Sequence, residues 1–281
     1  MTYHKGSRSL VCHYCGRREA VPVKCPSCAS TVIGRFGAGT EQLEEKCREL
    51  FPEAVIERLD MDTVSHKGTL EKVLKRFGEG RTDILIGTQL IAKGLDFGNV
   101  GLVGVISADV SLNIPDFRSA ERSFQLMTQA AGRAGRGAQQ GKVVIQCYQP
   151  QHPAVLCAAR HDYRSFYEHE LAVRKAVGYP PFSEVFQIVI SDADPARAEN
   201  SAAKWTAWLR TRIPAGMAVL GPAQSPINSI AGKYRYQILI KSPSGHRNET
   251  SALILNLRKA FTGDKGGAEL ITTDINPGSF L

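Results

Sequence analysis

The sequence predicts an α/β protein in which a doubly wound parallel sheet lies between a cysteine-rich segment and a small α+β domain. Three observations support this prediction. Short apolar segments alternate with amphipathic helical patterns between residues 36 and 150, as in open parallel sheets covered by helices. Two C-x-x-C units lie within residues 1–35, and strand patterns with a period of two return after residue 183. We therefore divide the chain into segments 1–35, 36–150, 151–182 and 183–281.

The composition is that of an ordinary globular protein with a basic bias. The chain has 281 residues, of which 43% are hydrophobic and 22% are charged. Its formal charge of +8 favours an anionic partner, although an excess of this size is about as common as a solubility feature. No segment has the apolar core of a signal peptide or enough consecutive apolar residues to span a membrane. These features predict a cytoplasmic protein without a membrane partner.

Four cysteines form two C-x-x-C units, Cys12–Cys15 and Cys25–Cys28. Each unit can direct two thiolates at one zinc ion, and a cytosolic chain keeps its thiols reduced rather than joined in disulfides. The separation between the units is shorter than is usual for paired C-x-x-C motifs. One shared zinc site with four cysteine ligands is our interpretation, and four free thiols in a flexible segment are the alternative.

Residues 36–150 contain the pattern of the parallel sheet. We expect a helix that has Thr40 as its N-cap and ends near Leu50, because apolar residues recur there at helical spacing. Apolar segments bounded by turn residues predict buried parallel strands. The remaining expected elements are strands at 55–59, 83–87, 100–106 and 141–148 and helices at 68–77 and 119–131. This alternation is typical of a single doubly wound α/β domain.

Two loops of this domain contain residues suited to a ligand. The segment GTQLIAKGLDF, residues 87–97, follows an expected strand, and open α/β sheets bind ligands at the carboxyl ends of their strands. The segment QAAGRAGRG, residues 129–137, places Arg133 and Arg136 among small residues, where planar guanidinium groups can approach phosphate oxygens. A tight turn alone would explain one such motif, but two at the edge of one sheet favour a function.

A nucleotide-binding loop is missing from these residues. No segment of the 281 residues fits G-x-x-x-x-G-K-[ST], and none is an acidic box suited to magnesium. The sequence therefore predicts that Arg133 and Arg136 act on a nucleotide that these residues do not themselves hold.

The last part of the chain has the pattern of an α+β sandwich. The expected elements are strands at 184–191, at 234–241 and near residue 271, and helices at 195–213 and 246–261. Residues 154–177 are expected to form one helix of a connector that ends at GYPP. Trp205 and Trp208 lie three residues apart on an expected helix, which favours a place in the core over a ligand contact.

One strand of this domain combines cations with tyrosines. A period of two places Lys233 and Arg235 on one face of the segment KYRYQILIK and Tyr234 and Tyr236 on the other. The basic face could contact phosphates while the other face packs or stacks on bases. A solvated charged face over core tyrosines is the alternative.

Several segments resemble a known family. GTQLIAKGLDF is similar to motif V, and QAAGRAGR to motif VI, of superfamily 2 helicases. The longer segment PDFRSAERSFQLMTQAAGRAGRG, residues 115–137, resembles the primosomal replication-restart helicases of that superfamily. CPSC, GAGTEQLEE, GYPPF and KYRYQILIK also occur in the family's order, so the resemblance extends over essentially the whole chain.

This resemblance implies that residues 36–150 form RecA-like helicase lobe 2 and that the chain is the carboxy-terminal part of an ATP-dependent 3′-5′ DNA helicase. Such a helicase restarts stalled replication forks and initiates primosome assembly. The implied partners are branched or forked DNA, primosome proteins and single-stranded DNA-binding protein.

Family members place an amino-terminal DNA-binding domain and a first helicase lobe before the residues matched here. We therefore expect ATP and Mg²⁺ to bind only together with that first lobe, and we expect the chain alone to lack ATPase activity. A noncatalytic DNA- and partner-binding module and an inactive truncated gene product are the alternatives.

The resemblance also implies roles for single residues of the two helicase motifs. In motif VI, Arg133 and Arg136 reach the phosphates of ATP, where they stabilise negative charge in the transition state, and Gln129 supports nucleotide or interlobe contacts. In motif V, Thr88 is implied to lie near phosphates, and Lys93 is implied to contact DNA as a cation. Asp96 and Gly94 are implied to lie on the side of the nucleotide.

Two further implications concern the ends of the chain. The family's zinc module has two interleaved sites. Each site takes one C-x-x-C unit from the first half of the module and one from the second half. Only the last two units are present here, so one shared zinc site and two half sites both stay open. The family's carboxy-terminal domain binds branched DNA, which favours phosphate contacts from Lys233, Arg235 and Lys241.

Overall fold

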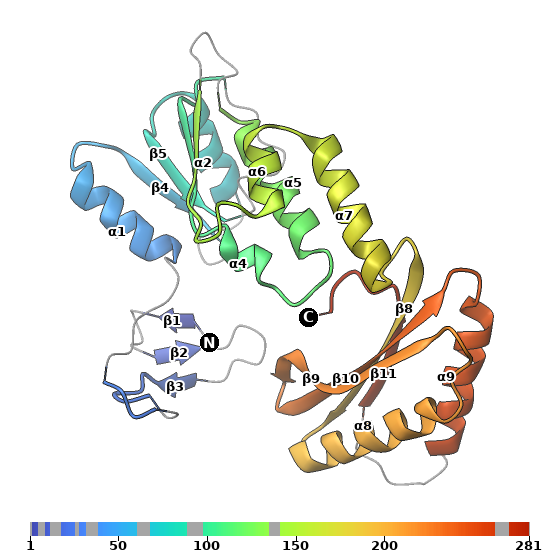
Figure 1. Cartoon of the computed structure of the whole chain (residues 1–281). Helices are drawn as coiled ribbons and strands as arrows, with labels where there is room; N and C mark the ends of the chain where they lie inside the picture. The colour runs from blue at the N-terminus through green and yellow to red at the C-terminus, as the bar shows by residue number, and fades with distance from the viewer. Residues whose placement is uncertain are drawn as a thin grey trace. The chain divides into compact units, whose positions relative to one another are not determined.

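The computed structural model describes residues 2–4, 9–11, 18–25, 28–31, 39–60, 68–88, 98–134, 141–261 and 270–280. The chain divides into two compact units (Figure 1). The first unit comprises Met1–Gly34, Pro115–Phe117 and Leu171–Leu281, and the second unit comprises Arg35–Ile114 and Arg118–Glu170. Each unit has its own sheets and is described separately.

The second unit contains the parallel strands that the sequence predicts. Strand β4 pairs in parallel with β5, and β6 pairs in parallel with β7, so the described strands form two separate pairs. The strands are β4 (Ile56–Leu59), β5 (Ile84–Gly87), β6 (Leu102–Val105) and β7 (Lys142–Ile145). The helices are α1 (Thr40–Leu50), α2 (Thr69–Gly78), α4 (Asp109–Leu112), α5 (Ser119–Ala131), α6 (Pro153–Ala159) and the first half of α7 (Tyr163–Val177). The α/β class is thereby confirmed.

Helix α5 is held by a compact apolar cluster. Phe124 and Met127 of α5 are buried against Val155 and Ala158 of α6 and Phe166 of α7. The rings of Phe124 and Phe166 are stacked, with centroids 4.2 Å apart and an interplanar angle of 3°. Burial of this kind stabilises a helix far more than its intrinsic propensity does. The cluster therefore fixes the helix that leads into the QAAGRAGRG segment.

Two local predictions about the helices of this unit were wrong. The N-cap of α1 is Gly39 rather than Thr40, because the Thr40 hydroxyl instead donates to the carboxylate of Asp60 at 2.6 Å. The expected helix 154–177 is broken into α6 and α7 at residues 160–162. His161 there has a φ of 54°, in the left-handed region, and the carboxylate of Asp162 accepts from the amide of Ser165 to begin α7.

The first unit is built around an antiparallel sheet with strand order β11-β8-β10-β9 (Figure 1). Its strands are β8 (Ser183–Asp192), β9 (Ala218–Ile230), β10 (Lys233–Pro243) and β11 (Leu270–Ile275). Helices α8 (Pro195–Arg210) and α9 (Arg247–Phe261) cover one face of it. Trp205 is 2% exposed in that core, and Trp208 packs against it, as the sequence predicts. The α+β prediction for this domain is confirmed.

Strand β9, which has thirteen residues, is not among the elements that the sequence predicts. Pro222, Pro226 and Gly221 interrupt its alternation and lower its strand propensity. The strand tolerates these residues because it lies at the edge of the sheet, where one side of the backbone needs no partner. Register shifts along its pairing with β10 accommodate the irregular segment.

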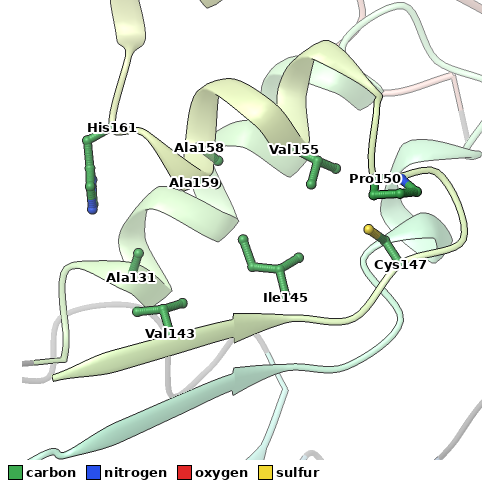
Figure 2. A pocket seen from close by; sticks show the side chains of 9 residues that line it. All are labelled: Ala131, Val143, Ile145, Cys147, Pro150, Val155, Ala158, Ala159 and His161. Atoms are coloured by element: carbon green, nitrogen blue, oxygen red, sulfur yellow. The ribbon is translucent and has the colours of Figure 1, made fainter.

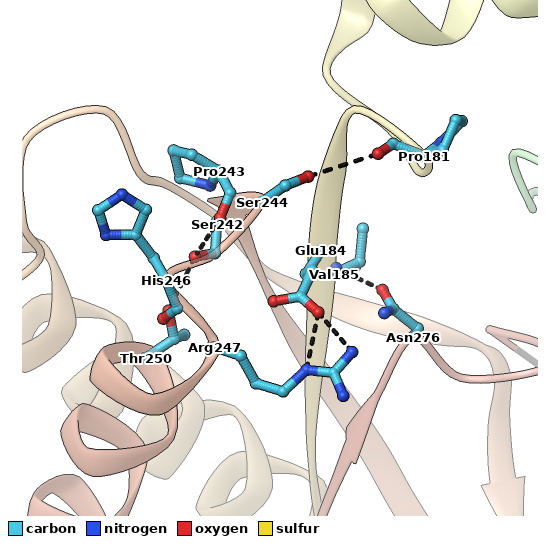
Figure 3. Close-up of polar contacts among 10 residues, drawn as sticks. All are labelled: Pro181, Glu184, Val185, Ser242, Pro243, Ser244, His246, Arg247, Thr250 and Asn276. Carbon is cyan, nitrogen blue, oxygen red and sulfur yellow. Dashed lines mark hydrogen bonds and ion pairs between the residues drawn. The ribbon is translucent and has the colours of Figure 1, made fainter.

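Polar contacts join the start of β8 to the end of β10 and the start of α9 (Figure 3). Arg247 donates from Nε to Oε1 of Glu184 at 2.7 Å, and the amide of Val185 donates to the side-chain carbonyl of Asn276 at 2.8 Å. The buried hydroxyls of Thr250 and Ser242 lie 2.9 Å apart in a hydrogen bond. These contacts fix the corner of the sheet from which the connector enters.

Three short strands precede the second unit: β1 (Thr2–His4), β2 (Ser9–Val11) and β3 (Arg18–Ala20). They form an antiparallel sheet in chain order. Among the residues that the structure describes, no helix is long and apolar enough to cross a membrane.

Candidate functional site

The carboxyl end of α5 presents the first part of the QAAGRAGRG segment. Gln129 lies exposed in the last turn of α5, and Arg133 lies half-buried just beyond the helix. The amides of Gly132 and Arg133 donate to the carbonyls of Thr128 and Ala130, so the chain stays in a tight helical turn. Gln129 and Arg133 are four residues apart, which is the spacing of neighbouring side chains on one helical face. Arg136 lies outside the described residues.

Gly132 directly follows the last residue of α5. A Cβ atom at this position would lie 3.4 Å from the carbonyl oxygen of Thr128, at the short limit of ordinary van der Waals contact. The backbone of Gly132 keeps right-handed helical dihedral angles, so the helical path continues toward Arg133.

Thr88 lies exposed at the carboxyl end of β5, as the sequence predicts. Strand β5 pairs in parallel with β4, with Gly87 opposite Leu59. Because the two strands run in the same direction, Thr88 and Asp60 leave the pair at the same edge. The other residues that the sequence analysis assigned to motif V, Lys93, Gly94 and Asp96, lie outside the described residues.

Asp60 is a candidate site residue that the sequence analysis missed. Its side chain is buried, accepts from the Thr40 hydroxyl at 2.6 Å and lies 3.4 Å from Nε of Arg58. The available signal was an acidic residue directly after an apolar strand, at the edge where parallel sheets bind ligands. Thr88 and Asp60 thus form one polar edge in the second unit.

The second C-x-x-C unit forms a closed turn. The Cys25 carbonyl accepts from the Ala29 amide at 2.9 Å, and the Cys25 amide donates to the Ser30 carbonyl at 2.8 Å. Ala29 has a φ of 57°, so the chain reverses directly after Cys28. Such a turn holds two cysteines close together, and thiolates in this arrangement suit zinc. Cys12 and Cys15 lie outside the described residues, and no group of three or more metal-ligating side chains occurs among those that are described.

Strand β10 shows the alternation that the sequence predicts. Tyr236 is buried in the core beneath the helices, together with Ile238 and Ile240. The Tyr236 hydroxyl donates to the Glu199 carboxylate at 3.1 Å. This tyrosine therefore packs in the core of the first unit, while the cations of β10 lie on the opposite face of the sheet.

The three cations of β10 differ in their surroundings. Lys233 is half-exposed at the start of the strand and helps to lower the pKa of Asp192, although Arg197 has the larger effect. Arg235 donates to the carbonyl of Ile227 at 3.3 Å, and burial lowers its pKa. Lys241 donates to a backbone carbonyl at 2.7 Å, and burial lowers its pKa as well. Lys241 therefore contacts the backbone of the connector at Val177. Lys233 and Arg235 lie near the other end of β10.

Three protein-family models match successive parts of this chain. Residues 175–278 match the Primosomal protein N C-terminal domain, and residues 33–138 match the Helicase conserved C-terminal domain. Residues 1–19 match the Cys-rich region domain of PriA DNA helicase. The chain matches the carboxy-terminal part of PriA. The resemblance that the motifs indicate is therefore confirmed, and the fold of the second unit is that of RecA-like lobe 2.

Relatives with this name align along nearly the whole chain. Replication restart protein PriA of Bacillus subtilis (strain 168) is 47% identical over 281 residues, which is 99% of this chain and 34% of that protein. PriA of Treponema pallidum (strain Nichols) is 46% identical over 244 residues, 87% of this chain and 37% of that protein. PriA of Haemophilus influenzae is 40% identical over 243 residues, 86% of this chain and 33% of that protein. The chain thus spans about a third of the length of these PriA relatives.

The second unit of this PriA-like chain also has an apolar cavity of about 400 Å³ (Figure 2). Val143 and Ile145 of β7 line it, together with Val155 of α6 and Ala131 at the end of α5. His161 stands at one side and is the single titratable nitrogen base among the described side chains that line it. A nucleotide needs cationic or hydroxyl partners for its phosphates, so this cavity does not suit one.

Proposed function

We propose that the chain forms the second motor lobe and the DNA-binding end of an ATP-dependent 3′-5′ DNA helicase. This helicase restarts stalled replication forks and initiates primosome assembly. The observation that supports the proposal most directly is the geometry after α5, where Gln129 and Arg133 follow a helix fixed by a buried aromatic stack. This geometry occurs within residues that match the Helicase conserved C-terminal domain.

Arg133 and Arg136 would bring positive charge to the phosphate oxygens of ATP. Guanidinium groups suit this role because they stay protonated and bind oxyanions in a bidentate way. The half-buried position of Arg133, on a turn held by backbone hydrogen bonds from the Gly132 and Arg133 amides, limits the directions in which its side chain can extend. ATP and Mg²⁺ would be held mainly by a first helicase lobe, and Gln129 would support the contact between lobes.

The polar edge of the second unit would couple nucleotide and DNA. Thr88 would contact phosphates, and Asp60 would orient Thr40 and Arg58 at the same edge. We assign Gly94 and Asp96 to the nucleotide side and Lys93 to the DNA by their places in motif V. Hydrogen-bonded carboxylates beside a phosphate site position donors rather than bind the anion directly.

Zinc and DNA would bind through the first unit. The backbone hydrogen bonds of the turn after Cys25 support this assignment, and the sulfur atoms of Cys25 and Cys28 would suit a structural zinc ion together with those of Cys12 and Cys15. Lys233 and Arg235 would contact the phosphates of branched or forked DNA. Primosome proteins and single-stranded DNA-binding protein are the partners that this function requires, and the cytoplasm is its compartment.

A chimaera tests the motor function. The 281 residues replace the matching part of B. subtilis PriA, and phosphate release is measured with forked DNA. We expect DNA-stimulated hydrolysis in the chimaera, and a decrease of at least tenfold with Arg133→Ala or Arg136→Ala at nearly unchanged DNA binding. The 281-residue chain alone should release phosphate at the background rate.

Arg164→Ala is the matched control, because Arg164 is a highly exposed arginine that pairs with Glu168 on α7. Its chimaera should hydrolyse ATP at the parent rate. A chimaera that binds forked DNA and hydrolyses no ATP would contradict the motor function and favour a noncatalytic DNA-binding module. Equal rates for the parent and the Arg136→Ala variant would remove the assigned role of that arginine.

A further inference from the structure

Four side chains form a continuous stack inside the first unit. The guanidinium carbon of Arg174 lies 5.1 Å from the ring centroid of Phe117. The rings of Phe117 and Tyr179 are stacked, with centroids 4.7 Å apart and an interplanar angle of 10°. On the outer side of Tyr179, Nζ of Lys241 lies 3.6 Å from the ring centroid. Each of the two stacked rings thus also has a cation over it, which is a favourable arrangement for the ring faces.

Further contacts hold the same place. Lys241 also donates from Nζ to the carbonyl of Val177 at 2.7 Å. Phe280, which is 3% exposed, packs against Phe117 with centroids 5.7 Å apart, and its amide lies 3.4 Å from a carboxylate oxygen of Asp116. Burial lowers the pKa of Lys241 and raises the pKa of Tyr179, as expected for groups withdrawn from water.

The stack lies just before helix α5 in the chain. Pro115–Phe117 belongs to the first unit, whereas the next residue, Arg118, belongs to the second. Helix α5 begins one residue later, at Ser119, and its other end leads into Gln129 and Arg133. The Ser119 hydroxyl donates to the Ile114 carbonyl, so the loop that contains Phe117 is closed at its base. The stack therefore lies one peptide bond from the unit that contains the motif VI helix.

We propose that Phe117 is a positioning residue, and that its stack with Tyr179 and Lys241 tethers the loop Pro115–Phe117 and, through the chain, the first turn of α5. Lys241 thereby serves the stack rather than a DNA phosphate. The tether rests on contacts within the first unit and on chain continuity. Its relevance to ATP rests on the function proposed above for Arg133 and Arg136.

Hydrogen exchange followed by mass spectrometry tests the tether in the full 281-residue chain. With Phe117→Ala, amides in the first turns of α5 should exchange about tenfold faster, because the substitution removes both an aromatic pair and a cation–ring interaction. Exchange in α1 and α2 of the second unit should stay unchanged. Lys241→Met retains most of the side-chain length but removes the charge, and it should produce a smaller increase in the same peptide.

The matched controls are Lys233→Met, a lysine of the same strand outside the stack, and Phe51→Ala, an exposed aromatic residue of the second unit. Neither should change exchange in α5. Unchanged α5 exchange in both Phe117→Ala and Lys241→Met would overturn the tether. A uniform increase in α1, α2 and α5 with Phe117→Ala would indicate general unfolding, and Lys241→Met would then decide by its effect on α5 alone. The exchange measurement needs no ATPase activity, so its failure is distinguishable from failure of the motor function.

Discussion

Arg197 donates two hydrogen bonds to one carboxylate oxygen of Asp192, from Nη2 at 2.8 Å and from Nε at 3.2 Å. Asp192 ends β8 and its side chain is 1% exposed, whereas Arg197 lies in the first turn of α8 and is 59% exposed. The amide of Asp194 donates to the same oxygen at 2.7 Å. This pair therefore joins the central strand of the first unit to the helix that covers it.

The pair makes the stability of the first unit depend on pH. The hydrogen bonds from Arg197, followed by that from the Asp194 amide, hold the pKa of Asp192 below its ordinary value. A carboxylate with a lowered folded-state pKa stabilises the fold above its unfolded-state pKa, and this contribution is lost as pH falls through the folded-state pKa. Arg197→Ala should lower the free energy of unfolding by roughly 1 kcal/mol at pH 7, since the arginine is partly solvated, and by less at pH 3.

Urea denaturation followed by tryptophan fluorescence measures this effect, because both tryptophans of the chain lie in α8. Arg164→Ala, which removes an exposed ion pair of α7, serves as the control and should change the midpoint little at either pH. An Arg197→Ala effect that is equal at pH 7 and pH 3 would assign the loss to packing and not to the charge of Asp192.

Gly221, the one glycine of β9, is expected to tolerate substitution poorly. Its φ is 105°, and a Cβ atom would lie 2.8 Å from the carbonyl oxygen of Gln237 on the neighbouring strand. Gly221→Ala should therefore lower the free energy of unfolding by about 3 kcal/mol, through both backbone strain and a collision with backbone atoms. Gly232→Ala provides the control, because Gly232 has a φ of 76° but no atom within 4 Å of a built Cβ. Its cost should be only about 1 kcal/mol. Equal costs in urea denaturation would refute the collision.

The metal content of the chain should reflect its four paired cysteines. Four thiolates complete one tetrahedral site, so elemental analysis should find at most one zinc per chain. Cys12→Ser and Cys28→Ser should each remove the metal if one site uses both C-x-x-C units. Cys157→Ser, at a half-buried cysteine of α6, should retain it. Close to two zinc ions per chain would contradict a shared site and favour two half sites completed by other ligands.

DNA binding through β10 should be visible in its dependence on salt. Reversal of Lys233 and Arg235 to glutamate should weaken binding to forked DNA without ATP. The slope of log affinity against log salt should become shallower by roughly 0.7–0.9 for each phosphate that the variant no longer neutralises. Fluorescence anisotropy across a salt series measures both quantities.

Reversal of Arg258 and Lys259 on α9 changes the net charge by the same amount and provides the control. These two residues lie in the last turn of a helix that covers the opposite face of the sheet. The same decrease in affinity in both double variants would show a response to net charge alone, and β10 would then have no specific role in DNA binding.

Local residue pattern was enough to predict the elements in which apolar residues recur regularly or form one continuous segment. Helix α5 and the alternation of β10 show such a pattern, because the apolar side chains of each meet the core of their own unit, and β8 is recognisable as a nearly continuous buried segment. The resemblance of two segments to helicase motifs V and VI was also visible in the residues alone, whereas the roles of single residues in these motifs stay predictions. The spacing of apolar residues was sufficient to predict a helix or strand wherever burial of one of its faces determines how it packs.

Features that depend on partners distant in the chain could not be predicted from local pattern. The edge position of β9 makes its prolines tolerable, and Asp60 takes the hydroxyl of Thr40 away from the helix cap that the sequence predicts. Lys241 shares a face with Arg235 by periodicity, yet its ammonium lies over Tyr179, a residue of the connector. A side chain's role depends on which groups share its desolvated surroundings, and those groups come together only when the chain folds.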